Sequence, residues 1–164
     1  MLDLKQAMRE AYAVNEGINQ YLLAHLEDAI WNAAPPGGKG RTIAAIVAHM
    51  HNVRRMWLAV AAKGKPLPDK LDRATLTRSQ ARQALAGSAR SIAELLSEAL
   101  DHTEGKVKGF RPDVAGALGY FISHDAHHRG QIAMLARQLG HPLAKQAEFG
   151  MWEWGTRWKE MRGA

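Results

Sequence analysis

The chain has 164 residues and no cysteine, which excludes disulfides, thiolate metal sites and cysteine nucleophiles. With 46% hydrophobic and 23% charged residues it has the composition of an ordinary globular protein, and its length suits one domain spanning residues 1–164. The formal net charge is +6, but Lys and Arg are spread along the chain with no basic run longer than Arg54-Arg55, which argues against a nucleic-acid partner.

The chain begins without a basic segment followed by an apolar run. No stretch approaches the about 18 uninterrupted apolar residues that a membrane span requires. We therefore expect a cytoplasmic protein that does not insert into a membrane.

Apolar residues recur every three or four positions in four long segments, which is the pattern of amphipathic helices. Stretches rich in Gly and Pro separate these segments. The pattern predicts an all-α fold, a four-helix bundle whose second and third connections are long enough for a crossover. The expected helices span residues 2–33, 42–62, 77–100 and 112–139.

Several residues match the expected helix ends. Thr42 and Thr77 can each accept a hydrogen bond from a free backbone N–H at the start of a helix. Pro112 suits a first helical turn, and Gly140 suits the left-handed residue that ends a helix. The remaining residues, 143–164, form a short Trp-rich C-terminal extension, which we expect to lie as a short helix over one end of the bundle.

Polar residues on the apolar faces of the helices are the candidates for a site. On the first helix, Asn15 lies among apolar residues, where it either lines a pocket or is an ordinary hydrogen-bonded core amide. On the second helix, His49 lies inside the apolar arc, whereas His51 lies outside it in line with Arg55 and is expected on the surface. That arc comprises Ile43, Ile46, Val47, Met50, Val53, Met56, Trp57 and Val60.

The fourth helix carries two histidines that point inward. His128 lies at the centre of its apolar stripe and His124 lies one turn earlier, whereas His127 is rotated toward solvent. A lone histidine on an apolar face is more often a hydrogen-bonded core residue, but two buried neutral imidazoles each need a partner, and shared coordination satisfies both. With His49, the pattern predicts a site for one divalent metal ion.

Two segments resemble a known family, the DinB/YfiT-like metalloenzymes. Residues 46–58, IVAHMHNVRRMWL, are similar to its second-helix pattern. Residues 124–132, HDAHHRGQI, with RQLGHP at 137–142, are similar to its fourth-helix signature. The resemblance covers most of the chain, but the Trp-rich extension is not part of the common pattern.

The resemblance implies a four-helix bundle with a three-histidine metal site that holds nickel or zinc, and a homodimer. Carried over residue by residue, the ligands are His49, His124 and His128, the same three that the helical wheels select. Family members of known activity include enzymes that use mycothiol or bacillithiol. The resemblance therefore favours thiol-dependent S-transfer to a small-molecule substrate in detoxification or stress response.

Other polar residues near the histidines are further candidates. Asp125 occupies the place of the glutamate base in the metalloprotease helix, although its shorter side chain favours a role beside the ligands or in an ion pair. Gln131, like Asn15, is a candidate for lining the pocket, and Arg54 and Arg129 are candidates for meeting an anionic substrate. Three functions stay open: a metal-dependent enzyme, a metal-binding stress protein without catalysis, and a metal-assisted hydrolase that uses Asp125.

Overall fold

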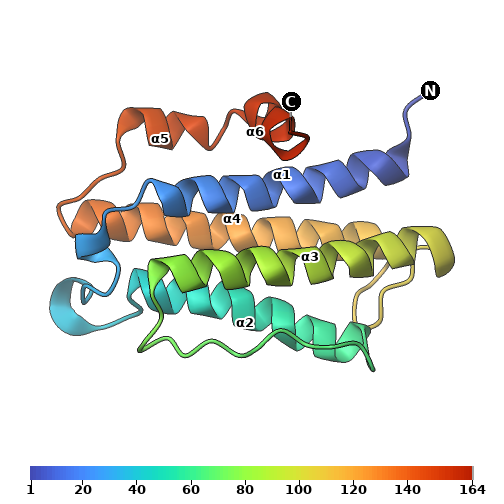
Figure 1. The fold of residues 1–164 in the computed structure, drawn as a ribbon, viewed down its shortest axis with the longest axis horizontal. Coiled ribbons are helices and arrows are strands. Elements are labelled where there is room, and N and C mark those ends of the chain that lie inside the picture. Colours follow the sequence, from blue (N-terminus) through green and yellow to red (C-terminus); the bar gives the residue numbers. More distant parts are fainter. Residues whose placement is uncertain (164) are drawn as a thin grey trace.

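The computed structural model describes residues 1–163, and all regular elements in this range are helices. Four long helices form a bundle, and two short helices follow it (Figure 1), which confirms the predicted all-α fold. The elements are α1 (Leu4–Ala24), η1 (Asp28–Ile30), η2 (Pro36–Gly38), α2 (Ile43–Ala61), α3 (Arg78–His102), α4 (Val114–Gln138), α5 (Lys145–Gly150) and α6 (Trp154–Met161).

The order of the helices around the bundle differs from their order along the chain. Helix α1 packs beside α3 and α4, and α2 packs beside the same two helices, so α1 and α2 lie at opposite corners. The connection 62–77 runs back beside α2 over the length of the bundle (Figure 1), and α2 and α3 therefore run in the same direction. This connection is the crossover that its length allows.

Most of the predicted helix ends are confirmed. Thr42 and Thr77 each accept a hydrogen bond from the backbone N–H three residues later, and Gly140 has a φ of 83°. The prediction for Pro112 was wrong, because the residue that caps α4 is Asp113, whose carboxylate accepts hydrogen bonds from two backbone N–H groups of the first turn. A carboxylate at this position also interacts favourably with the helix dipole.

The first helix ends at Ala24, well before residue 33. Ile30 and Trp31 are buried in the core, and the indole Nε1 of Trp31 donates a hydrogen bond of 2.7 Å to the backbone carbonyl of Leu76. Because these apolar side chains pack back onto the end of the bundle, the chain has to leave the helix before it reaches them. The spacing of Ile30 and Trp31 predicts a continued helix, but their burial depends on an irregular connection.

The apolar core consists of two clusters, and a layer of buried polar side chains lies between them along each long helix. On α4, for example, Phe121 belongs to one cluster and Ile132 to the other, with Asp125 and His128 between them. Buried polar groups need hydrogen-bond or metal partners. This polar layer is therefore where a functional site is to be sought.

The C-terminal helices lie along α1 rather than over one end of the bundle (Figure 1), which corrects the prediction for the Trp-rich extension. The guanidinium of Arg157 lies 4.0 Å from the ring centre of Tyr21 on α1. The indole Nε1 of Trp158 donates a hydrogen bond of 2.8 Å to Glu10. Trp152 and Trp154 remain exposed, so the extension is held mainly through its last helix.

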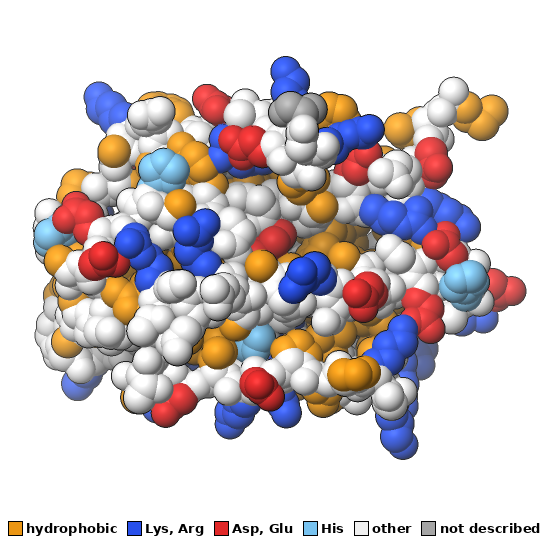
Figure 2. Space-filling view, viewed as in Figure 1, with side chains coloured by type: hydrophobic (Ala, Val, Ile, Leu, Met, Phe, Trp, Pro, Cys, Tyr) orange, Lys and Arg blue, Asp and Glu red, His pale blue; other side chains and the backbone are white. Residues whose placement is uncertain are grey.

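None of the helices within residues 1–163 is long and apolar enough to cross a membrane. On the face drawn in Figure 2, Lys and Arg side chains are scattered among Asp and Glu and do not gather into one stripe.

Candidate metal centre

The structure brings the three predicted ligands together between α2 and α4. His49 comes from α2, His124 and His128 come from α4, and one ligand nitrogen of each lies within 4.8 Å of the others. The ring centroids of His49 lie 5.4 Å from His124 and 4.8 Å from His128. Four residues separate His124 from His128, which places their rings on the same side of α4, one turn apart.

The spacing of the α4 histidines fits a shared ion. The Nε2 atoms of His124 and His128 are 3.2 Å apart. Metal–nitrogen bonds of about 2.0–2.1 Å put two nitrogens of a tetrahedral site about 3.3 Å from each other. The donor chemistry fits as well, because neutral imidazole is a common ligand of divalent transition metals. These three residues could therefore hold a divalent ion.

Gln131 orients one of the three rings. Its side-chain oxygen lies 2.8 Å from Nδ1 of His128. An amide oxygen only accepts hydrogen bonds, so Nδ1 carries the proton and the lone pair is left on Nε2, the nitrogen that faces His124. The side-chain nitrogen of Gln131 is 3.0 Å from Nε2 of His127, which remains exposed as predicted. Gln131 thus lies beside the candidate centre and is hydrogen-bonded to one of its three histidines.

Replacing Gln131 by leucine is expected to weaken metal binding about tenfold while the fold is kept. Hydrogen-bond partners that hold a ligating histidine typically contribute 10–100-fold to metal affinity. The change is measured by competition with a chromogenic chelator. Gln138→Leu, on the exposed end of the same helix, is the matched control and should bind metal like the parent protein. Equal affinity in both variants would contradict the orienting role.

The local environment keeps two of the rings neutral. Burial lowers the pKa of His128 to about 4, with help from the neighbouring histidines, and the hydrogen bond to Gln131 opposes this effect only in part. Burial, together with the positive charge of Arg41 and the nearby His124, lowers the pKa of His49. Both rings therefore offer lone pairs near neutral pH, as metal binding requires.

Asp125 is buried on the inner side of the same helix turn. Its Oδ2 accepts hydrogen bonds of 2.7 Å from Arg54, 2.6 Å from Asn15 and 2.9 Å from Asn19. Burial acts to raise the pKa of Asp125, but the Arg54 charge and these hydrogen bonds outweigh it and hold the pKa below its ordinary value. The other oxygen, Oδ1, is 4.0 Å from Nδ1 of His124. Asp125 is therefore an ionised carboxylate directly behind the candidate ligands.

The surrounding residues complete a polar network that joins the four long helices. Arg54 on α2 also contacts Glu16 on α1 at 2.9 Å and donates to the backbone carbonyl of Leu85 on α3 at 2.9 Å. Arg129 on α4 donates to the side-chain oxygens of Asn15 and Asn19 at 2.8 and 2.6 Å. Asn15 is thus a hydrogen-bonded core amide, one of the two alternatives considered, and its partners belong to the network behind the histidines.

Three expectations for α2 were wrong. His51 is only 1% exposed, because the connection 62–77 covers that side of the helix and offers the carbonyls of Asp69 and, from α3, Ala84 to the two ring nitrogens. Arg54 is equally buried and is occupied by carboxylates, so it is not free to meet a substrate. At the far end of the predicted arc, Met56 and Val60 are exposed.

The sequence did contain a signal for the buried ion pair. Arg54 follows Met50 by four residues and precedes the buried Leu58 by four, so it lies on the stripe that faces the core. Asp125 lies four residues after Phe121 and three before His128 in the same way. Opposite charges on two inward-facing stripes predict a buried pair, provided that the two helices are known to be neighbours.

Aromatic side chains form one wall beside the histidines. The ring of Tyr120 lies nearly parallel to that of His124, with centroids 5.8 Å apart and an interplanar angle of 17°. Trp57 and Phe110 pack against each other with centroids 4.2 Å apart, and both contact Tyr120. Trp57, a member of the apolar arc predicted for the second helix, thus lies in a cluster that adjoins the candidate centre.

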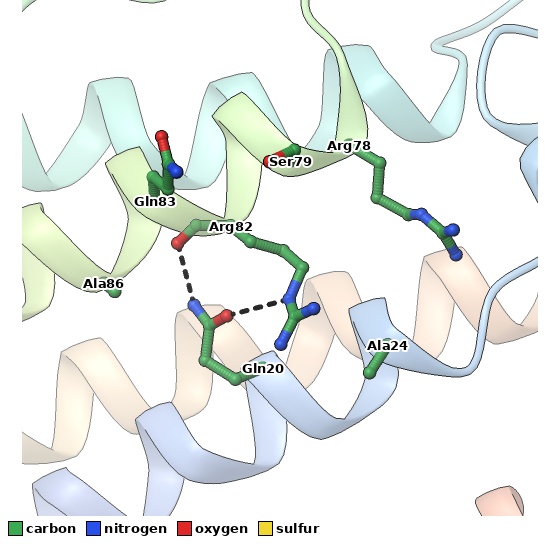
Figure 3. A pocket seen from close by; sticks show the side chains of 7 residues that line it. All are labelled: Gln20, Ala24, Arg78, Ser79, Arg82, Gln83 and Ala86. Atoms are coloured by element: carbon green, nitrogen blue, oxygen red, sulfur yellow. Dashed lines mark hydrogen bonds between the residues drawn. The ribbon is translucent and has the colours of Figure 1, made fainter.

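A hollow of about 470 Å³ lies between α1 and α3, away from the histidines (Figure 3). Gln20 and Arg82, the polar residues at its centre, bond to each other: Gln20 Nε2 donates to the Arg82 carbonyl at 3.0 Å, and Arg82 Nε donates to Gln20 Oε1 at 3.2 Å. Its lining contains no histidine, aspartate or glutamate, so the histidine cluster is the better candidate for a metal site.

Comparison with known proteins identifies the family. The sequence model of the DinB family matches residues 1–159, nearly the whole chain, so the protein belongs to the DinB family. The match ends at residue 159 and so includes most of the Trp-rich extension. This corrects the expectation that the extension lies outside the family pattern. No curated protein and no solved structure matches this chain.

Proposed function

We propose that this member of the DinB family is a divalent-metal-dependent enzyme in which His49, His124 and His128 hold the ion. The observation that carries the proposal is the convergence of three imidazole nitrogens from two helices. Among residues 1–163, this group of possible ligands includes no fourth histidine and no carboxylate. Three protein ligands leave positions for a substrate, as in catalytic rather than structural zinc sites. Nickel and zinc both suit such ligands.

The reaction that we propose is transfer of a low-molecular-weight thiol to an electrophilic small molecule. When bound, a divalent ion among three neutral imidazoles supplies a positive charge that favours the deprotonated, nucleophilic form of a thiol at neutral pH. The resemblance to thiol-using enzymes of the family supports this substrate class. A role in detoxification or stress response follows from the same chemistry, because electrophiles are removed in this way.

The residues around the histidines have separate parts in this proposal. Gln131 keeps the proton of His128 on Nδ1. Tyr120 stacks on His124 and is backed by Trp57, so these two rings form one wall of the proposed centre. Asp125 holds the histidine-bearing turn of α4 against α1 and α2 through Asn15 and Arg54.

The arrangement favours a role for Asp125 in positioning the α4 histidines over a role as the general base of a hydrolase. A general base has to reach the proton that it removes, directly or through one water. Asp125 is 1% exposed, and its Oδ2 already accepts three hydrogen bonds. A hydrolase that uses this carboxylate would have to break the network first.

Turnover with and without metal tests the proposal. Untagged protein is stripped with a chelator, reloaded with nickel or zinc, and assayed with glutathione, bacillithiol or mycothiol and a panel of electrophiles. We expect thiol consumption only in the reloaded protein, with no loss in the His127→Ala control. Metal binding without turnover for any pair would favour a metal-binding stress protein without catalysis, and equal turnover by the stripped protein would exclude metal dependence.

The proposal includes a homodimer, as the resemblance implies, and a location in the cytoplasm. Support for a protein contact comes from large apolar side chains on the surface of the C-terminal extension, where Phe149, Trp152 and Trp154 are exposed. Exposed apolar patches of this kind are typical of interaction sites.

A further inference from the structure

A pocket of about 530 Å³ opens beside His49, and most of its charged residues are basic. Arg41, Lys70 and Arg73 line it, together with one acidic residue, Asp72. Since His49 is itself part of the lining, a molecule in this pocket lies next to the candidate metal centre.

The three cations are not neutralised by the protein. No ion pair or side-chain hydrogen bond joins Arg41, Lys70 or Arg73 to another residue in the range 1–163. Elsewhere in the bundle, Arg9 and Arg78 are paired with carboxylates. Three cations beside one carboxylate, Asp72, in a concave surface leave a net positive potential that attracts anions.

The segment that carries two of these cations is anchored to α2. Asn52 exchanges two hydrogen bonds with the backbone of Leu71, at 3.1 and 3.0 Å. His51 and Arg55 bond to backbone carbonyls of the same segment at 2.8 and 2.9 Å. Four side-chain to backbone hydrogen bonds therefore fix this wall of the pocket, so less conformational entropy is lost when a ligand binds.

The third cation, Arg41, lines the same pocket as His49. Ala45 and Ala48 on α2 also line the pocket, and their side chains are small.

We propose that this pocket binds the anionic group of the substrate, a carboxylate or a phosphate on a small organic molecule, and so directs its reacting part toward the three histidines. Arginine suits this task because its planar guanidinium can bind either group through two parallel hydrogen bonds. That the bound molecule is a substrate rests on the proposed function, whereas binding of the anion does not require catalysis.

Calorimetric titration with succinate and with inorganic phosphate tests the proposal, in nickel-loaded and in metal-free protein. We expect both forms of the parent protein to bind at least one of the two anions. The double variant Arg41→Gln/Arg73→Gln should bind that anion about tenfold more weakly, because two exposed charge-assisted contacts are lost. Succinate binding more tightly than phosphate assigns the pocket to carboxylates, and the reverse order assigns it to phosphates.

The matched control is Arg90→Gln/Arg111→Gln, which removes the same charge from exposed positions outside the pocket and should leave anion affinity unchanged. Equal weakening in both double variants would overturn the proposal, because it would reflect net charge alone. Binding that occurs only in the nickel-loaded protein and resists Arg41→Gln/Arg73→Gln would also overturn it, as would the absence of binding by the parent protein. None of these results depends on turnover.

Discussion

Replacing His128 by alanine is expected to lower the affinity for nickel or zinc by at least about 100-fold. Four-ligand zinc sites have apparent binding free energies of about 10–16 kcal/mol, which is about 3 kcal/mol for each ligand. His128 is the most buried of the three histidines, and its Nε2 lies 3.2 Å from that of His124. Its loss leaves two nitrogens, so the bound ion would exchange readily with solvent. Elemental analysis of untagged protein and isothermal titration measure the change.

His127→Ala provides the control for this experiment. His127 is the immediate neighbour on the same helix, is exposed, and is absent from the three-histidine group. Both variants remove one imidazole from α4, but only His128 belongs to the three-histidine group. Equal metal content in His127→Ala and His128→Ala would show that the ion is not held between α2 and α4.

Replacing Arg54 by methionine is expected to lower the free energy of unfolding by about 3–5 kcal/mol, the range for removing one partner of a buried ion pair. The substitution leaves the carboxylate of Asp125 buried without its cation and removes the contact to Glu16. Denaturant unfolding followed by tryptophan fluorescence measures the change. Arg55→Met is the control, since Arg55 contacts only a backbone carbonyl and should contribute less than about 1 kcal/mol.

The pH dependence of this effect has a definite sign. In the parent protein the pKa of Asp125 is lowered, so its contribution to stability is present above the unfolded pKa of about 3.9 and is lost as pH falls below it. Without Arg54 the buried carboxyl group binds a proton more easily in the folded state. We therefore expect the stability difference between parent and variant to shrink as pH falls from 7 toward 4.

A double substitution separates charge from packing. Arg54→Met combined with Asp125→Asn removes both members of the buried pair, so the loss of stability should be smaller than the sum of the two single losses. Strictly additive losses would contradict the ion pair as the origin of the effect.

Much of the bundle followed from periodicity. Apolar residues at three- and four-residue spacing located the four long helices, and Thr42 and Thr77 marked where two of them begin. The prediction failed at residues 25–33, where the same spacing occurs in an irregular connection that packs back into the core. Local spacing says which side chains can share a face, but it does not say whether the backbone stays helical.

The amino-acid order alone was enough to find the three histidines, because the helical repeat sets the direction in which His49, His124 and His128 point. It was not enough for His51 or Arg54. Whether a given side of α2 meets solvent depends on the connection 62–77 and on helices far away in the sequence, which arrive only when the chain is folded. Contacts between distant segments thus decided which polar groups are buried and paired and which stay exposed.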